Sequence, residues 1–167
     1  MRKRRNPETI AGVVGGLQVI YVSALSELWA EQVPRSNWLL FAIADAATQV
    51  PANAVTACLR RNPAVICCAG TYAPALEDIF DLELALQTVN WEIQHPGPGP
   101  EHNLAMPVTT SDTNIQDALC YAITVAPGMC EKVIDTVVCI DFTHSYQTQI
   151  RELVTQLATG WLPAAYS

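Results

Sequence analysis

The stretch "WLLFAIADAATQVPANAVTACLRRNPAVICCAG" (residues 38–70) decides the fold class. It contains two near-continuous apolar runs, 38–44 and 64–68, with the length and composition of strands buried on both faces. Between them Pro51 opens a helical segment, and an Asn-Pro pair ends it. Strands that alternate with helices over short connections form βαβ units, so the sequence predicts an α/β fold with a parallel sheet.

The same alternation extends on both sides of this stretch. Residues 18–22 (QVIYV) predict a strand, and a short helix is expected over 24–32. Residues 76–91 predict a largely buried helix, because apolar side chains recur throughout the segment. These apolar residues are Leu76, Ile79, Phe80, Leu82, Leu84, Leu86 and Val89.

The second half of the chain has weaker patterns within what we expect to be a single domain, 1–167. The Pro/Gly-rich segment 95–107 predicts a loop or linker inside that domain. The further expected elements are a helix over 113–120, a strand over 121–125, an ambiguous segment over 131–142 and a helix over 145–159 that ends at Gly160.

The N-terminus supports two interpretations. A basic cluster, residues 2–5, precedes an apolar run over 10–28, which is the pattern of a signal peptide or signal anchor. The glycines and polar residues within the run favour instead a helix that Asn6 caps and that Gly15 and Gly16 end. We therefore expect a cytoplasmic protein, with a membrane-anchored or secreted protein as the alternative.

Charge and cysteine content narrow the function classes. The net charge of −7, with basic residues clustered only at the N-terminus, argues against a nucleic-acid partner. The six cysteines lie within or beside apolar runs and lack Cys-x-x-Cys spacing, so we expect reduced structural thiols and no metal site. Three disulfides in a secreted protein are the alternative. Cys67 and Cys68 are adjacent, and on a strand they would face opposite sides of the sheet.

Several segments together resemble the short-chain dehydrogenase/reductase family. The sequence "CCAG" (67–70) is similar to that family's Asn-Asn-Ala-Gly motif, and the segment that follows it, through Asn90, resembles the family's next helix. Asp45 matches an Asp that contacts the adenine ring, and "ITVAPGM" (123–129) resembles a Pro-Gly motif beside the nicotinamide. The order of these pieces agrees with the family.

The resemblance implies a Rossmann-like parallel sheet with flanking helices, incomplete relative to a full-length member. It implies NAD or NADP as cofactor and a small-molecule substrate. The cofactor-binding residues would be Asp45, Cys68, Ala69, Gly70, Pro127 and Gly128, and Asn90 would belong to the catalytic set. In open α/β sheets ligands bind beyond the carboxyl ends of the strands, where Asp45 and Gly70 are expected.

The chain departs from this family at the residues that carry its chemistry. The Gly-rich phosphate-binding turn is absent, and neither Lys3 nor Lys132 has the Tyr four residues earlier that proton transfer in this family requires. The implied protein is therefore oxidoreductase-like without an identifiable Ser/Tyr/Lys set. The alternatives are a secreted or membrane-anchored, disulfide-bonded α+β interaction protein and a noncatalytic subunit, with homo- and hetero-oligomers both left open.

One further pattern carries chemistry. Asp141 and His144, three residues apart, would position an imidazole beside a carboxylate. A hydrolase built on this pair lacks the Gly-x-Ser-x-Gly sequence that usually presents the nucleophile, so the sequence ranks it below the oxidoreductase hypothesis.

Overall fold

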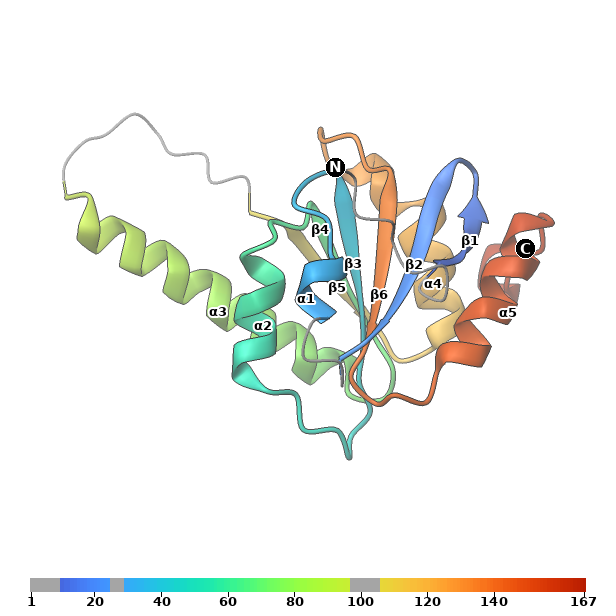
Figure 1. The fold of residues 1–167 in the computed structure, drawn as a ribbon, viewed down its shortest axis with the longest axis horizontal. Coiled ribbons are helices and arrows are strands. Elements are labelled where there is room, and N and C mark those ends of the chain that lie inside the picture. Colours follow the sequence, from blue (N-terminus) through green and yellow to red (C-terminus); the bar gives the residue numbers. More distant parts are fainter. Residues whose placement is uncertain (1–9, 25–28, 97–105) are drawn as a thin grey trace.

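The computed structural model describes residues 10–24, 29–96 and 106–167, and they form an α/β domain around a six-stranded sheet (Figure 1). The strands are β1 (Ile10–Val14), β2 (Leu17–Ser23), β3 (Trp38–Ile43), β4 (Val65–Ala69), β5 (Val108–Asp112) and β6 (Thr136–Asp141). The helices are α1 (Trp29–Gln32), α2 (Ala52–Leu59), α3 (Ala73–Gln94), α4 (Ile115–Thr124) and α5 (Gln147–Ala158), with short 3-10 helices at Ala126–Met129 and Ala164–Tyr166. The predicted Rossmann-like α/β fold is confirmed.

The strand order is β1-β2-β6-β3-β4-β5, and all neighbours except β1 and β2 are parallel. Every residue of β3, β4 and β6 is buried. This is why β3 and β4 read as unbroken apolar runs, whereas β6 (TVVCID) is apolar only at its four central residues. The last strand, β6, lies between β2 and β3 although it comes more than 90 residues after both.

Helices cover both faces of the sheet (Figure 1). Helices α1, α2 and α3 pack on one face, and α4 and α5 pack on the other. Cys67 belongs to the apolar cluster under α4 and α5, whereas Cys68 belongs to the cluster under α1 to α3. The predicted alternation of these two side chains is confirmed. All six cysteines are free, and five of them are buried.

The N-terminal helix prediction is wrong for the residues that the structure describes. β1 and β2 form an antiparallel hairpin, and Gly15 and Gly16 make its turn with φ of 55° and 86°. Two consecutive positive φ values suit a hairpin turn that follows the twist of the strands, and glycine adopts them without a steric penalty. The proposed cap Asn6 lies outside the described residues. No described helix has the length and apolar character needed to cross a membrane.

One prediction in the second half is also corrected. In the segment 121–125, expected as a strand, residues 121–124 are the last turn of α4 and Val125 is its C-cap, because buried side chains continue at helical spacing from Ile115 through Leu119 to Ile123. Asn114 caps this helix by accepting hydrogen bonds from two backbone N–H groups of its first turn. The edge strand β5 lies in a polar segment that gave no apolar signal, and the ambiguous segment 131–142 contains β6.

The long helix α3 is confirmed, but it is not largely buried. Leu76, Phe80 and Leu84 pack against the sheet, whereas Leu82 and Leu86 are exposed. Figure 1 shows why: the C-terminal half of α3 runs past the edge of the sheet, so half of the helix has no sheet beneath it.

Candidate functional site

The carboxyl edge of the sheet contains a topological switch point at β6. The chain leaves β6 toward α5 on one face, whereas it leaves β2 and β3 toward α1 and α2 on the other. Connections that diverge in this way open a crevice on each side of β6, and such crevices are where open α/β sheets bind ligands. The candidate site is therefore the β6–α5 loop, residues 142–146, and the strand ends beside it.

Asp141, the last residue of β6, organises this loop. Its carboxylate is fully buried. One oxygen, Oδ1, accepts hydrogen bonds from Thr143 N and Oγ1 at 2.8 and 2.7 Å and from His144 N at 3.0 Å. The other, Oδ2, accepts from Tyr21 Oη at 2.6 Å and from Tyr146 N at 2.8 Å. A buried carboxylate that accepts five hydrogen bonds is satisfied, so its role is to fix the loop.

A serine and a histidine meet on one side of β6. Ser23 ends β2 directly beside Asp141, and its Oγ lies 2.8 Å from Nδ1 of His144. His144 has a φ of 63°, in the left-handed region that non-glycine residues rarely occupy. The surrounding hydrogen bonds hold it there, and backbone strain of this kind is concentrated at functional sites.

A second polar group lies on the other side of β6. Asp45 follows β3, and its Oδ1 accepts from both N and Oγ1 of Thr71 at 3.2 Å. Its Oδ2 accepts from Tyr146 Oη at 2.8 Å. Burial and then the hydrogen bond to Asp45 raise the pKa of Tyr146, so this phenol is a poor general base at neutral pH.

The predicted residues at the end of β4 lie next to Asp45. Gly70 has a φ of 96°, and a Cβ placed on it would lie 2.4 Å from the backbone oxygen of Ala44. Glycine is thus required here by the close approach of the neighbouring strand. Cys68 and Ala69 are buried within β4, and desolvation raises the pKa of the Cys68 thiol, which stays protonated at neutral pH.

Three predicted site residues are not brought to this edge. Asn90 is exposed on α3, 17 residues after the helix begins at Ala73, which is about 26 Å along the axis. Pro127 and Gly128 follow α4, which starts at the carboxyl edge and returns the chain to the amino ends of the strands. The expectation that these residues join Asp45 and Gly70 is therefore corrected.

The turn from β4 into α3 does not offer free N–H donors to the diphosphate of a dinucleotide in its first three residues. The N–H groups of Thr71, Tyr72 and Ala73, which lead into α3, already donate to Asp45, Ala44 and Gly70. The pair Gly15-Gly16 lies at the opposite edge, in the hairpin turn. NAD or NADP binding stays a prediction that rests on the position of Asp45 beside the end of β4.

A hollow of about 250 Å³ opens at the carboxyl ends of β4 and β5. It is lined by Cys67, Cys68, Thr110, Ser111, Asp112, Ala118, Tyr121 and Tyr166. Sites for drug-sized ligands enclose about 300–1,000 Å³, so this hollow accommodates only a small group.

Sequence reasoning missed Ser23, Thr71 and Tyr146 as members of the site. Ser23 and Thr71 each lie at or just after the end of a buried parallel strand. This position at a strand end is the same signal that had pointed to Asp45.

Within the described ranges, no group of three or more His, Cys, Asp or Glu side chains could hold a metal ion. Comparison of the chain with protein-family models, with curated proteins and with solved structures finds no match.

Proposed function

We propose that this protein catalyses acyl transfer or hydrolysis on a small carbonyl compound bound at the carboxyl edge of the sheet. Ser23 is the nucleophile and His144 is the general base. The observation that carries the proposal is the 2.8 Å contact between Ser23 Oγ and His144 Nδ1 at the switch point. A nucleophile and a base within hydrogen-bond reach are the minimum that this chemistry requires.

The reaction follows from the geometry of the pair. As Ser23 Oγ forms a bond to the carbonyl carbon, its proton passes to Nδ1 of His144. The imidazolium then returns this proton to the leaving group as the bond to that group breaks. Water, activated by the same nitrogen, hydrolyses the acyl-Ser23 and restores the hydroxyl. Asp141 is a positioning residue, because it holds the backbone of His144 rather than its ring.

The surroundings of the pair predict a slow enzyme. The N–H groups of Ala24, His144 and Ser145 all donate within the protein, so none of these three stabilises an oxyanion. One oxyanion donor contributes roughly 10²–10³ in rate. We therefore expect turnover of activated esters first, and of unactivated esters far more slowly.

The experiment combines two measurements: phosphonylation of Ser23 by a fluorophosphonate probe, with release of fluoride, and hydrolysis of p-nitrophenyl acetate. Ser23→Ala should abolish probe labelling, whereas Ser36→Ala, an exposed serine at the amino end of β3, should leave it unchanged. His144→Asn should lower both activities at least tenfold while keeping the fold, because Asn tolerates the left-handed backbone. Labelling that survives Ser23→Ala would overturn the proposal.

A second proposal retains the oxidoreductase-like function, with NAD or NADP held at the β3–β6 crevice. It is favoured by the position of Asp45 beside Gly70 at a switch point, where a carboxylate can accept hydrogen bonds from a nucleoside. Calorimetric titration with NADH and NADPH tests it. This function would be supported if Asp45→Ala weakens binding of the cofactor and Asp81→Ala leaves it unchanged. Asp81 lies on the exposed side of α3 and is the control. No heat of binding near millimolar ligand would remove it.

A further inference from the structure

The hollow at the carboxyl ends of β4 and β5 is separate from the proposed catalytic site. Two strands, β6 and β3, lie between β2, which carries Ser23, and β4, so ligand binding in the hollow does not depend on the Ser23–His144 pair. Three parts of the chain line it: the ends of β4 and β5, helix α4 and the 3-10 helix Ala164–Tyr166. They converge on one concavity at the edge where α/β sheets bind ligands.

The register of β5 decides which of its side chains face α4. Thr110 pairs with Cys67, whose side chain belongs to the apolar cluster under α4 and α5. Asp112 lies two residues after Thr110 on the same strand, so it points to that same face. Ser111 points to the other face, where its hydroxyl donates to Glu77 of α3. The α4 side of the hollow therefore carries a carboxylate at the end of the edge strand.

This carboxylate has an oxygen that the described residues leave available. Asp112 Oδ1 accepts a hydrogen bond from Asn114 N at 2.8 Å, and no described residue donates to Oδ2. The half-buried rings of Tyr121 and Tyr166 line the same hollow. None of the lining residues that the structure describes is basic. The hollow thus combines a carboxylate with two aromatic rings, and its own lining holds no cation to neutralise the charge.

The electrostatics of the hollow favour a cation over an anion. Two N–H groups in the first turn of α4 donate to Asn114 Oδ1, and the N–H of Asn114 donates to Asp112, so these three groups do not bind an anion. Burial raises the pKa of Tyr166, and the ionised forms of Cys120, Asp117 and Asp112 raise it further. The phenol therefore keeps its proton at neutral pH, in a potential that attracts positive charge.

We propose that the hollow binds a small organic cation, an alkylammonium with a few carbon atoms. The ammonium donates to Oδ2 of Asp112, and the carbon atoms beside it contact the rings of Tyr121 and Tyr166. The negative face of an aromatic ring attracts an ammonium and the polarised carbon atoms next to it. The apolar end of the ligand replaces water against Ala118 and the thiol of Cys67, which burial keeps neutral.

The dimensions of the hollow and the exposure of Asp112 set a modest affinity. A hollow of about 250 Å³ excludes larger ligands, and an ion pair with an exposed carboxylate contributes little in water. We expect a Kd of about 1–10 mM at low salt. Because salt screens exposed charges, this Kd should rise with ionic strength.

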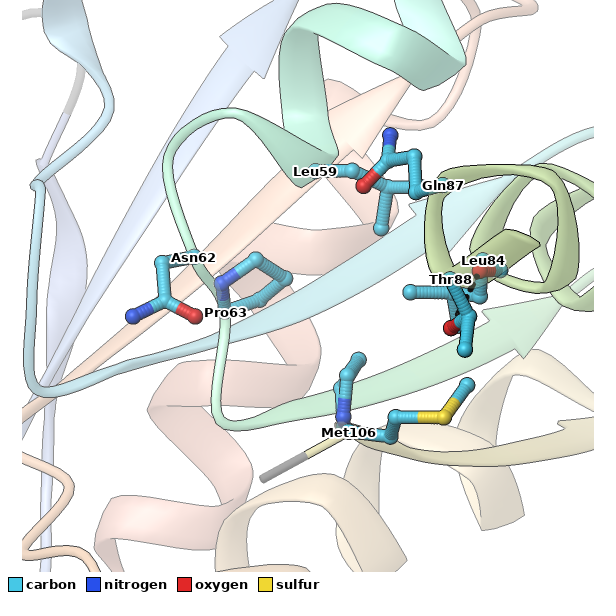
Figure 2. Close-up of a pocket in the computed structure, with 8 residues that line it drawn as sticks. Leu59, Asn62, Pro63, Leu84, Gln87, Thr88 and Met106 are labelled. Atoms are coloured by element: carbon cyan, nitrogen blue, oxygen red, sulfur yellow. Dashed lines mark hydrogen bonds between the residues drawn. The ribbon is translucent and has the colours of Figure 1, made fainter. Parts of the chain in front are cut away.

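A second cavity provides a control within the same molecule. Figure 2 shows it at the opposite edge of the sheet, between α2, α3 and the start of β5. It encloses about 100 Å³, and its lining consists of apolar and uncharged polar side chains, among them Leu59, Leu84 and Gln87. With no carboxylate in this lining, the cavity should not bind the cation.

The test is a titration followed by ¹⁵N–¹H correlation NMR, with n-propylammonium chloride added to about 50 mM at constant ionic strength. n-Propanol, which lacks the charge, and sodium propionate, which reverses it, are the matched comparisons. The amide signals of Thr110, Asp112 and Tyr121 should shift saturably with propylammonium and much less with the other two compounds. The signals of Gln87 and Thr88, at the second cavity, should not shift.

Two pairs of variants assign the contacts. Asp112→Asn keeps an acceptor for the N–H of Asn114 and should raise the Kd about three- to fivefold, whereas Asp78→Asn, at an exposed carboxylate on α3, should leave it unchanged. Tyr121→Leu should raise the Kd about two- to fourfold, whereas Tyr121→Phe retains the ring and most of the affinity. The correlation spectrum itself confirms that each variant is folded.

Three results would overturn the cation site: no saturable shift with propylammonium, equal shifts with n-propanol, or an unchanged Kd in Asp112→Asn. Shifts of similar size at Gln87 and Thr88 would also overturn it, because they would mean unspecific uptake. Equal affinities of Tyr121→Leu and Tyr121→Phe would overturn the aromatic contact.

Discussion

Replacement of Asp141 by Asn removes the charge at the centre of the β6–α5 loop and keeps its shape. The carboxylate accepts three hydrogen bonds at Oδ1 and two at Oδ2. An amide has only one acceptor oxygen, so it will keep that oxygen toward Thr143 and His144. Its NH₂ group then faces Tyr21 and Tyr146.

The expected cost follows from these contacts. The hydroxyl of Tyr21 can rotate and accept from the new amide, but the backbone N–H of Tyr146 loses its acceptor, which costs about 1–3 kcal/mol. The remaining bonds to residue 141 change from charge-assisted to neutral, at roughly half their former strength. Together these losses predict a decrease of about 3–5 kcal/mol in the free energy of unfolding. For a chain of this size that lowers Tm by roughly 10 °C.

Urea denaturation of Asp141→Asn, Tyr21→Phe and the double variant measures this cost. Tyr21→Phe alone removes one charge-assisted bond and should cost about 1.5–3 kcal/mol. When Asp141→Asn is already present, the same change should cost less than about 1 kcal/mol, because the bond there is already neutral. Asp78→Asn, at an exposed carboxylate on α3, is the control and should stay within about 0.5 kcal/mol. A cost below about 1 kcal/mol for Asp141→Asn, or strict additivity with Tyr21→Phe, would refute the assignment of Asp141 as the organiser of the loop.

Gly70→Ala should lower the free energy of unfolding by about 3 kcal/mol, because the residue has a left-handed φ and its new Cβ would lie 2.4 Å from a backbone oxygen. Gly128→Ala is the control: its Cβ would meet no atom within 4 Å, so its free energy of unfolding should stay within about 0.5 kcal/mol of the wild type in the same urea titration. One thiol, Cys130, should react rapidly with Ellman's reagent in the native protein and six should react in guanidinium, since the other five are buried; fewer than six would mean disulfides. Burial raises the pKa of the Cys67 thiol to about 11 and that of the Cys58 thiol to about 12. Because these thiols lose their protons at lower pH in the unfolded chain, the free energy of unfolding should fall as pH rises from about 9 to 12. A Tm that is constant over that interval would contradict the burial of these thiols.

The local elements were largely predictable, because burial on both faces leaves an unbroken apolar run and a capped helix leaves periodic apolar residues. The runs that became β3 and β4 and the helix between them follow this logic. The N-terminal hairpin was not predictable in the same way. Its apolar residues fit helical spacing as well as strand alternation, and only pairing with β2 decides between them.

The order of the strands could not be read from the sequence. The apolar runs indicate that β2 and β3 are strands, but not that β6 lies between them. Ser23 and His144 are 121 residues apart and meet because β6 pairs with β2 in a register that aligns Ser23 with Asp141. The sequence thus identified single strand ends such as Asp45, while the pairing that creates the serine–histidine contact depends on tertiary packing.

The motif that gave rise to the family resemblance has a local physical cause. A parallel strand that turns directly into a helix beside another strand brings its turn against the neighbouring backbone. Gly70 permits this close approach because it has no Cβ, and Asp45 fixes the turn by accepting a hydrogen bond from the backbone N–H of Thr71. These contacts favour a small-residue turn and a nearby carboxylate whether or not a cofactor binds. The Ser23–His144 contact, in contrast, does not help to join β3 to β4. It is therefore a stronger indication of function than the "CCAG" motif, and Ser23 is the first residue to test.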